Sequence, residues 1–331
     1  MRAQLLFSPA PIGQSPLRLD EVPVPEPGPG EILFRVSACG VCHTDLHIAE
    51  GELPAPHLPV IPGHQVVGKI IALGSDAGDW SVGDRAGVFW LYRSCGRCGF
   101  CRRGEENLCP DAEFTGLHHN GGYAEYLVAD AGFAVRLPEN FNDVAAAPLL
   151  CAGVIGYRSL RKAELQPGET LGLFGYGASA HLALQTAKYW GCRVFVFTRS
   201  AAHQRHALDL NADWAGLASD PAPAPLDRAV IFAPSGALVP AALERLRPGG
   251  TLSINAIVMS NLPELPYSLL YGERTVRSVT NATRRDAMEF LRLAAEIPIH
   301  VTANPFPLQD ANRVLQLLKD AKIDGAAVLQ P

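Results

Sequence analysis

The chain has 331 residues, 48% of them hydrophobic and 18% charged, with a formal net charge of −5. This length suits two domains, and the apolar content is enough for two cores. The acidic balance argues against a nucleic-acid partner, and no apolar run has the length of a membrane span. The start "MRAQLLFSPAPIG" lacks the unbroken apolar run of a signal peptide. We therefore expect a cytoplasmic protein whose eight cysteines serve as metal ligands, catalysts or core residues rather than disulfides.

The first half of the chain carries short β-like runs separated by glycine and proline. Three examples are "EILFRVSA", "QVVGKIIALG" and "YAEYLVA". Runs of this kind predict an irregular, β-rich domain. Within it, "ACGVCHTDLH" from Ala38 to His47 holds two cysteines, two histidines and an aspartate. Cys42 of this stretch, with His64 of "IPGHQVVG" and Cys151 of "PLLCAGVIGY", forms a candidate zinc site that leaves a fourth position open for chemistry.

A second cysteine cluster follows in "CGRCGFCRRGEENLC", where the spacing is C-x2-C-x2-C-x7-C. Four thiolates can close a tetrahedral shell around zinc and leave no position for a substrate. The candidate ligands of this structural metal are Cys95, Cys98, Cys101 and Cys109. An iron–sulfur cluster also uses four thiolates, so it stays open as the alternative.

From Thr170 onward strands and helices alternate, which predicts a parallel sheet covered by helices. "TLGLFGYG" and "CRVFVFT" are predicted strands, with a helix over "ASAHLALQTAKYW" between them. The turn "GYGASA" matches G-x-G-x-x-A, the fingerprint of a dinucleotide-binding Rossmann domain. Gly175 permits the tight turn, Gly177 lets the backbone approach a pyrophosphate, and Ala180 allows close packing of helix on strand. Two amphipathic helices are predicted in the tail, over "RRDAMEFLRLAAE" and "LQDANRVLQLLKDAK".

The end of the second predicted strand bears on which nicotinamide cofactor is bound. NAD-specific domains carry an acidic residue there, which binds the ribose hydroxyls. This chain has Thr198, followed by Arg199 and Ser200. No carboxylate repels a 2′-phosphate, and the guanidinium can pair with one. We predict that NADP(H) is preferred over NAD(H), with Arg205 as a further contributor.

The order of "GVCHTDLH", "PGHxxxG", the four-cysteine loop, "LCAG" and the nucleotide fingerprint resembles the zinc-dependent alcohol dehydrogenases of the medium-chain dehydrogenase/reductase superfamily. The resemblance covers essentially the whole chain. It implies an α/β protein with a GroES-like, β-rich catalytic domain over residues 1–152 and 282–331. A Rossmann domain with a doubly wound parallel sheet would span residues 153–281. It also implies a homodimer or homotetramer that interconverts alcohols, above all primary ones, and aldehydes.

The same resemblance implies roles for the residues around the catalytic zinc, held by Cys42, His64 and Cys151. Thr44 would hydrogen-bond the reacting oxygen, and His47 would pass its proton toward solvent through the cofactor ribose. Asp45 would orient His64, and His43 would lie near the cofactor pyrophosphate. The pocket residues would be Trp90 and Leu117.

Two positions depart from the family pattern. Gln65 stands where a glutamate usually assists ligand exchange at the zinc, and Ala326 stands where an arginine often binds the pyrophosphate. These departures keep one rival open, a non-catalytic redox sensor that binds zinc and nucleotide. The other rival is a quinone or enone reductase of the same superfamily, but such enzymes lack this set of zinc ligands.

Overall fold

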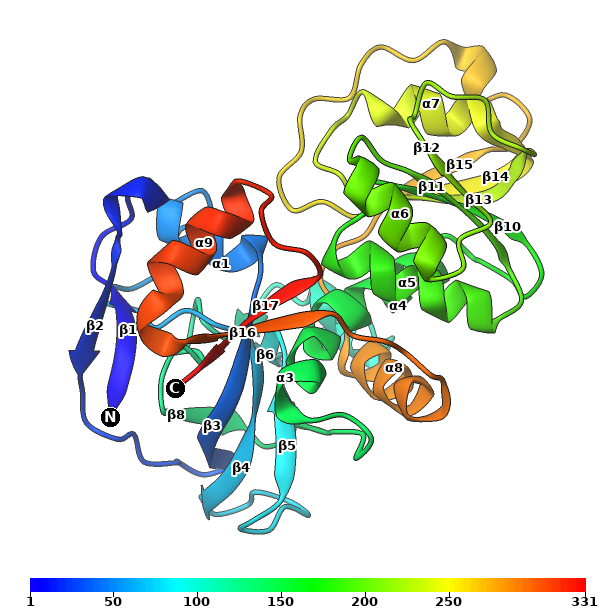
Figure 1. The fold of residues 1–331 in the computed structure, drawn as a ribbon. Coiled ribbons are helices and arrows are strands. Elements are labelled where there is room, and N and C mark those ends of the chain that lie inside the picture. The colour runs from blue at the N-terminus through cyan, green and yellow to red at the C-terminus, as the bar shows by residue number, and fades with distance from the viewer. The chain divides into compact units, whose positions relative to one another are not determined.

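The computed structural model describes all 331 residues of the chain (Figure 1). They form two compact units. The first unit holds residues Met1–Val154, Asn281–Glu296 and Val301–Pro331, and the second holds Ile155–Thr280 and Ile297–His300. None of the helices combines the length and apolar character that crossing a membrane requires.

The first unit is built on a seven-stranded sheet in the order β16-β17-β3-β4-β5-β9, with β8 paired to β3. Its central strand β3 is buried along most of its length, because β4, β8 and β17 all pair with it. The strands of this sheet are β3 (Glu31–Val41), β4 (Gln65–Leu73), β5 (Arg85–Val88), β8 (Tyr126–Asp130), β9 (Val135–Arg136), β16 (Ala303–Pro307) and β17 (Ala326–Gln330).

Smaller elements complete this unit and match the irregular β-rich domain expected from the sequence. Two two-stranded antiparallel sheets pair β1 (Arg2–Leu6) with β2 (Leu17–Glu21) and β6 (Leu91–Arg93) with β7 (Glu113–Phe114). The helices are α1 (His43–Glu50), α2 (Gly99–Arg102), α3 (Asp143–Ala146), α8 (Arg284–Glu296) and α9 (Ala311–Lys319), with 3-10 turns at Ile12–Gln14, Glu106–Leu108, Ala147–Leu150 and Leu308–Asp310. Both predicted tail helices therefore form.

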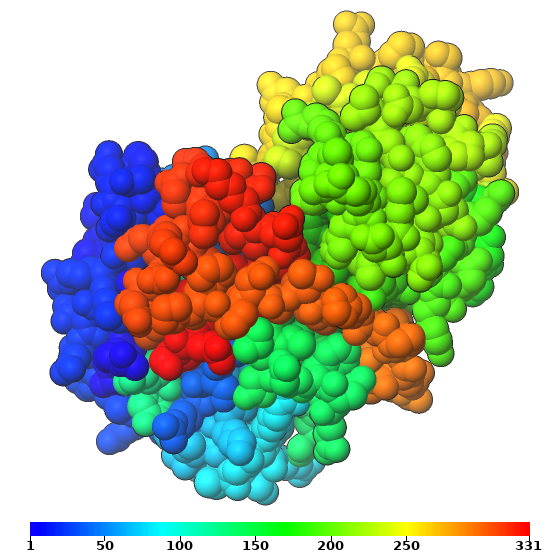
Figure 2. Space-filling view, viewed as in Figure 1, coloured from blue at the N-terminus to red at the C-terminus, as the bar shows by residue number.

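The C-terminal tail returns to the first unit and becomes part of its sheet. β17 runs antiparallel to β3, with Ala327 opposite Val41. Figure 2 shows the tail, in orange and red, packed beside N-terminal residues in blue. The contact includes a hydrogen bond from Leu17 N to Asn312 Oδ1 of 3.0 Å. The sequence does not predict β16 because two prolines interrupt "ANPFP", but an edge strand tolerates residues that cannot donate to a ladder.

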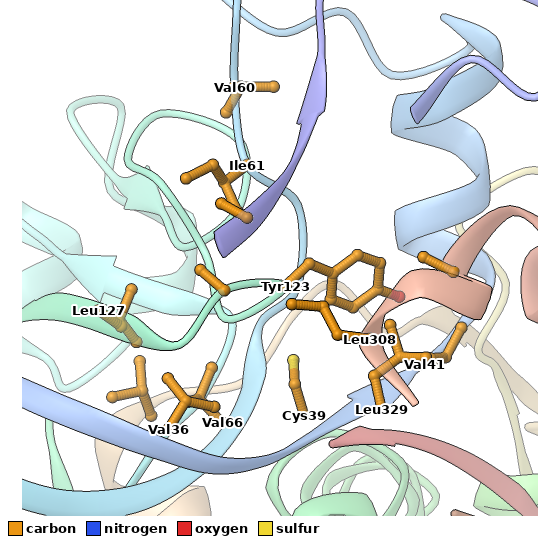
Figure 3. Packing of buried hydrophobic residues seen from close by; sticks show 14 of the residues in the cluster. Val36, Cys39, Val41, Val60, Ile61, Val66, Tyr123, Leu127, Leu308 and Leu329 are labelled. Atoms are coloured by element: carbon orange, nitrogen blue, oxygen red, sulfur yellow. The ribbon is translucent and has the colours of Figure 1, made fainter. Parts of the chain in front are cut away.

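The core of the first unit surrounds Tyr123, whose ring is fully buried (Figure 3). Cys39 lies beside this ring, together with Leu308 and Leu329 from the tail (Figure 3). Cys39 therefore fills space in the core. Gly63 packs so closely that a Cβ there would lie 2.4 Å from Tyr123 and 2.8 Å from the Cys39 sulfur. This close packing fixes the loop that carries His64.

The second unit is a six-stranded parallel sheet in the order β12-β11-β10-β13-β14-β15. Numbered within the unit, the order is 3-2-1-4-5-6, that of a Rossmann sheet. The strands are β10 (Thr170–Phe174), β11 (Arg193–Phe197), β12 (Trp214–Gly216), β13 (Leu226–Ile231), β14 (Leu246–Ile254) and β15 (Thr275–Ser278). The helices are α4 (Ala152–Lys162), whose first three residues belong to the first unit, α5 (Ala178–Tyr189), α6 (Ala201–Asp209) and α7 (Leu238–Arg245), with a 3-10 turn at Tyr267–Leu269. The predicted fold class is confirmed.

Candidate active site

The stretch that opens the first site changes from strand to helix at Cys42. The Cys42 sulfur accepts a hydrogen bond of 3.3 Å from Thr44 N, and Cys42 N donates one of 3.0 Å to Asp45 Oδ2. This reciprocal pair is a capping box at the N-terminus of α1. The cap fixes the Cys42 side chain at the point where β3 ends.

The fold brings together three candidate ligands that are far apart in the sequence. The ligand atoms of Cys42, His64 and Cys151 all lie within 4.8 Å of one another. Cys42 Sγ and His64 Nε2 are 3.5 Å apart. The three residues come from the end of β3, the loop before β4 and the turn before α4. Cys39 is not part of this group.

Asp45 contacts the ring nitrogen of His64 that does not face Cys42. Its Oδ1 lies 3.2 Å from His64 Nδ1 and accepts a hydrogen bond of 3.1 Å from Gly63 N. Both side chains are buried, with 0% exposed for Asp45 and 1% for His64. A carboxylate on one ring nitrogen directs the other nitrogen, Nε2, toward the ligand position.

The electrostatics of the set favour a bound cation. Burial alone would lower the pKa of His64, but the charges of Cys42 and Asp45 outweigh it and raise this pKa to about 10. A hydrogen bond from Cys151 and the nearby His64 hold the pKa of the Cys42 thiol well below its usual value. Two sulfurs and one imidazole nitrogen are ligands that zinc prefers, and three such ligands leave a fourth position open. The residues present therefore fit a catalytic zinc.

Gln65 begins β4 and lies opposite Gly40 of β3. Its side chain is 2% exposed and lies so close to Gly40 that a Cβ there would be 2.7 Å from Gln65 Oε1. Glycine at position 40 therefore makes room for the Gln65 side chain. At this position the buried amide adds no charge to the group formed by Cys42, Asp45 and His64.

Aromatic side chains continue outward from His64. The Trp90 ring meets His64 edge-on, with centroids 5.0 Å apart, and stacks on Phe114 at 4.9 Å. The Trp90 ring thus lies against a candidate metal ligand. Leu117 is only 4% exposed and belongs to the hydrophobic core. Sequence reasoning missed Phe114, because a lone phenylalanine in a short strand carries no local signal.

The residues expected to move a proton lie on α1. Thr44 is 4% exposed and directly follows His43, whose side chain is exposed. His47 lies one turn further on, with its ring centroid 6.4 Å from that of His43. α1 itself was not predicted, because its eight residues are too few for a clear apolar repeat. Ala327 pairs with Val41, so the uncharged Ala326 lies beside Cys42 at the start of β17.

The four-cysteine loop also gathers its sulfurs. Cys98 Sγ and Cys101 Sγ are 3.5 Å apart, Cys95 and Cys109 are 3.5 Å apart, and Cys95 and Cys101 are 3.9 Å apart. Zinc–sulfur bonds of about 2.3 Å at tetrahedral angles place sulfurs about 3.8 Å apart. Hydrogen bonds from the backbone N–H groups of Arg97 and Cys98 lower the pKa of Cys95 to about 7. The spacing fits one metal ion rather than a cluster, whose iron and sulfide atoms would separate the thiolates further.

The second unit holds the predicted nucleotide turn between β10 and α5. Gly175 has φ +89°, and a Cβ there would lie 2.7 Å from Ala233, so only glycine fits. Gly177 is the N-cap of α5, and the position of its missing Cβ has no atom within 4 Å. Ala180 is 1% exposed and packs in the core beneath the turn. The free backbone at Gly177 and the N-terminus of α5 fit a pyrophosphate.

The end of β11 presents the residues predicted to select the cofactor. Thr198 is 8% exposed, and Ser200 caps α6 by accepting a hydrogen bond of 3.3 Å from His203 N. Arg199 and Arg205 are exposed, and neither side chain forms an ion pair or hydrogen bond within the chain. Arg199 therefore offers an unpaired positive charge beside Thr198.

Known proteins resemble this chain over its full length. The family model "Alcohol dehydrogenase GroES-like domain" matches residues 28–139. A probable alcohol dehydrogenase of Mycobacterium tuberculosis is 48% identical over 99% of this chain and 97% of its own length. A thermostable alcohol dehydrogenase from Pyrobaculum aerophilum, solved with cobalt and zinc, has a TM-score of 0.90 at 27% identity, covering 100% of this chain and 99% of that one. A zinc-binding dehydrogenase from Sinorhizobium meliloti bound to NADP has a TM-score of 0.88 at 26% identity, with coverage of 100% and 99%.

The chain therefore belongs to the zinc-dependent alcohol dehydrogenases of the medium-chain dehydrogenase/reductase superfamily, and it interconverts alcohols and aldehydes with a nicotinamide cofactor.

Proposed function

We propose that the chain binds two zinc ions with different roles and interconverts primary alcohols and aldehydes with NADP(H). Cys42, His64 and Cys151 would hold the catalytic ion. The observation that carries this proposal is their convergence on one point, with Asp45 behind His64. The four-cysteine loop would hold a structural ion with no position for a substrate.

The chemistry divides between the bound groups and the side chains. Zinc supplies a Lewis acid for the substrate oxygen, and the nicotinamide supplies the hydride acceptor or donor. The Thr44 hydroxyl accepts the proton of the substrate hydroxyl and releases its own hydrogen toward His47, which passes a proton on to solvent. In the reverse direction the same residues return a proton to the oxygen of the aldehyde. His43 contributes a polar group toward the cofactor phosphates, where Ala326 provides none.

The preference for primary alcohols rests on Trp90. Its ring lies against His64 and stacks on Phe114, so a large, rigid side chain occupies the space next to the ligand set. A branched carbon beside the reacting oxygen would meet this ring, whereas a primary alcohol or slim aldehyde would pass it.

A panel of aldehydes, assayed with NADPH and NADH alongside metal analysis, tests the function. We expect two zinc ions per chain and higher kcat/KM for aldehydes than for ketones of equal size. Ketones reduced as well as aldehydes would refute the proposed substrate class, and iron with labile sulfide would refute the structural zinc.

The preference for NADP(H) is tested by Arg199→Ala. Hydrogen bonds to a charged phosphate contribute about 1.5–3 kcal/mol. Their loss should raise the Kd for NADPH by roughly 10- to 100-fold, while the Kd for NADH changes less than about twofold. Fluorescence titration of both cofactors measures this, and Arg193→Ala is the control because Arg193 binds Thr170 at the opposite end of β11. Equal kcat/KM with both cofactors in the unmodified enzyme would contradict the preference.

A second variant, Gln65→Glu, tests the effect of having an amide at the position where the family usually has a glutamate. We expect both metals to remain bound and activity to stay within about tenfold of the parent, because changes behind a ligand set modulate a metal site. The added carboxylate should alter the rate of product release, which single-turnover and steady-state kinetics separate. Complete loss of zinc would show that the amide is structurally required.

We also infer a homodimer or homotetramer in the cytoplasm. β15 is the edge strand of the second unit's sheet, and an open edge can pair with a second copy. The segment before it exposes Ile257, Tyr267 and Tyr271 at 60%, 74% and 71%, which supports association through this region. All eight cysteines are free of disulfides, as a reducing compartment favours. Analytical ultracentrifugation measures the oligomeric state.

A further inference from the structure

The end of α1 brings a carboxylate onto His47. α1 ends at Glu50, and Gly51 follows with φ +82°. A Cβ at Gly51 would lie 2.9 Å from Pro9, so glycine fits both the backbone angle and the space. The chain then turns back, with Leu53 N donating a hydrogen bond of 3.0 Å to His47 O. This turn places Glu52 Oε2 in hydrogen-bonding contact with His47 Nδ1.

The other groups near His47 do not bind its ring in this way. His43 lies with its ring centroid 6.4 Å away. Glu50 accepts a hydrogen bond of 2.8 Å from Ile12 N and two from Lys319 Nζ, of 2.7 and 2.9 Å. Glu50 is thus committed to holding α1 against the N-terminal segment and α9. The carboxylate that binds the His47 imidazole is that of Glu52.

The contact decides which nitrogen of His47 can accept a proton. In a neutral imidazole one nitrogen donates and the other accepts, and the hydrogen bond made by the first selects the form present. A carboxylate on Nδ1 keeps the hydrogen there and leaves the lone pair on Nε2. The His47 side chain is 16% exposed and Glu52 51%, so the ring is partly covered while the carboxylate reaches solvent.

We propose that Glu52 is a positioning residue for the proton relay, which holds His47 Nδ1 so that Nε2 is the proton-accepting nitrogen. This rests on the relay role proposed for His47. During alcohol oxidation one proton leaves the substrate hydroxyl by way of Thr44 and binds His47 Nε2. The imidazolium then releases one proton to water or a buffer base, and Glu52 stays ionised throughout. During aldehyde reduction the proton moves in the opposite direction.

Buffer rescue and a double-mutant cycle test the proposal. Glu52→Gln should lower kcat for alcohol oxidation at neutral pH by roughly tenfold, less than the 10²–10⁴-fold that a whole acid–base group contributes. A diffusible base such as imidazole should restore most of that loss, because it replaces the relay. Glu52→Asp, which keeps the charge, should lie closer to the parent enzyme. In a His47→Gln background Glu52→Gln should have no further effect, since both changes interrupt one path.

Glu50→Gln is the matched control, because it removes a neighbouring carboxylate that binds Lys319 instead of His47. Glu50→Gln should lower the thermal stability, and added imidazole should not change the kcat of this variant. Suppose that Glu52→Gln is fully active while His47→Gln is slow and is rescued by imidazole. This result would overturn the role of Glu52 but leave the relay through His47 intact. A fully active His47→Gln variant would instead overturn the proposed relay. A loss in Glu52→Gln that imidazole does not restore, and that adds to that of His47→Gln, would assign Glu52 a structural role and also refute the inference.

Discussion

Cys42→Ala is expected to abolish alcohol oxidation and aldehyde reduction while the chain stays folded. The candidate catalytic site has only three ligands, Cys42, His64 and Cys151, so removing one leaves two and the ion is lost. Without the ion nothing polarises the substrate oxygen, and kcat/KM should fall by more than about 10³-fold. The N-cap of α1 also loses its acceptor sulfur, which costs about 1 kcal/mol.

Metal analysis, circular dichroism and kinetics check this expectation together. The variant should keep one zinc ion per chain, its secondary structure, and an unfolding temperature close to that of the parent. Cys39→Ala is the matched control, because this thiol lies three residues before Cys42, on β3, and packs in the core. It should retain two zinc ions and the activity, with a small loss of stability from the core. A Cys42→Ala variant that keeps both zinc ions and turns over would refute the ligand assignment.

Cys98→Ala is expected to act in the opposite way, by damaging stability more than chemistry. Cys98 caps α2, which has four residues, and the adjoining 3-10 turn Glu106–Leu108 has three. Elements this short do not persist alone, so we expect the loop to depend on the proposed metal ion. Structural zinc binding in small peptides contributes about 10–16 kcal/mol to folding. Loss of one thiolate should therefore unfold the loop locally and lower the unfolding temperature.

Thermal unfolding and limited proteolysis measure this change. The variant should be cut within residues 95–109, keep the catalytic zinc, and retain turnover at low temperature. Ser94→Ala is the control: the Ser94 hydroxyl accepts a 3.5 Å contact from Cys101 Sγ, and its removal leaves all four thiolates. An unchanged unfolding temperature in Cys98→Ala would contradict a structural role. If this variant and Cys42→Ala lost activity and stability in equal measure, the distinction between an open and a closed metal site would fail.

The sequence by itself determined the features that depend on short spacing. The four cysteines lie within fifteen residues of chain, so their spacing alone brings the sulfurs within reach of one ion. The strand, glycine turn and helix around Gly175 are contiguous in the same way, and alternating strands and helices identify the Rossmann sheet. Both tail helices follow from a clear apolar repeat. Such features are fixed by local geometry and do not depend on how the rest of the chain folds.

Only the tertiary structure decided how distant residues meet. His64 and Cys151 reach Cys42 because β3, β4 and the turn before α4 pack together. The sequence alone supports this set only through motif order and resemblance. Phe114 against Trp90 and Glu52 against His47 gave no sequence signal, since single residues in a short strand or turn have no periodicity. β16 escaped prediction because its partner β17, rather than its own proline-rich sequence, makes it a strand. In these cases the stabilising free energy comes from strand pairing and side-chain packing between distant segments. A local sequence pattern does not encode those contacts.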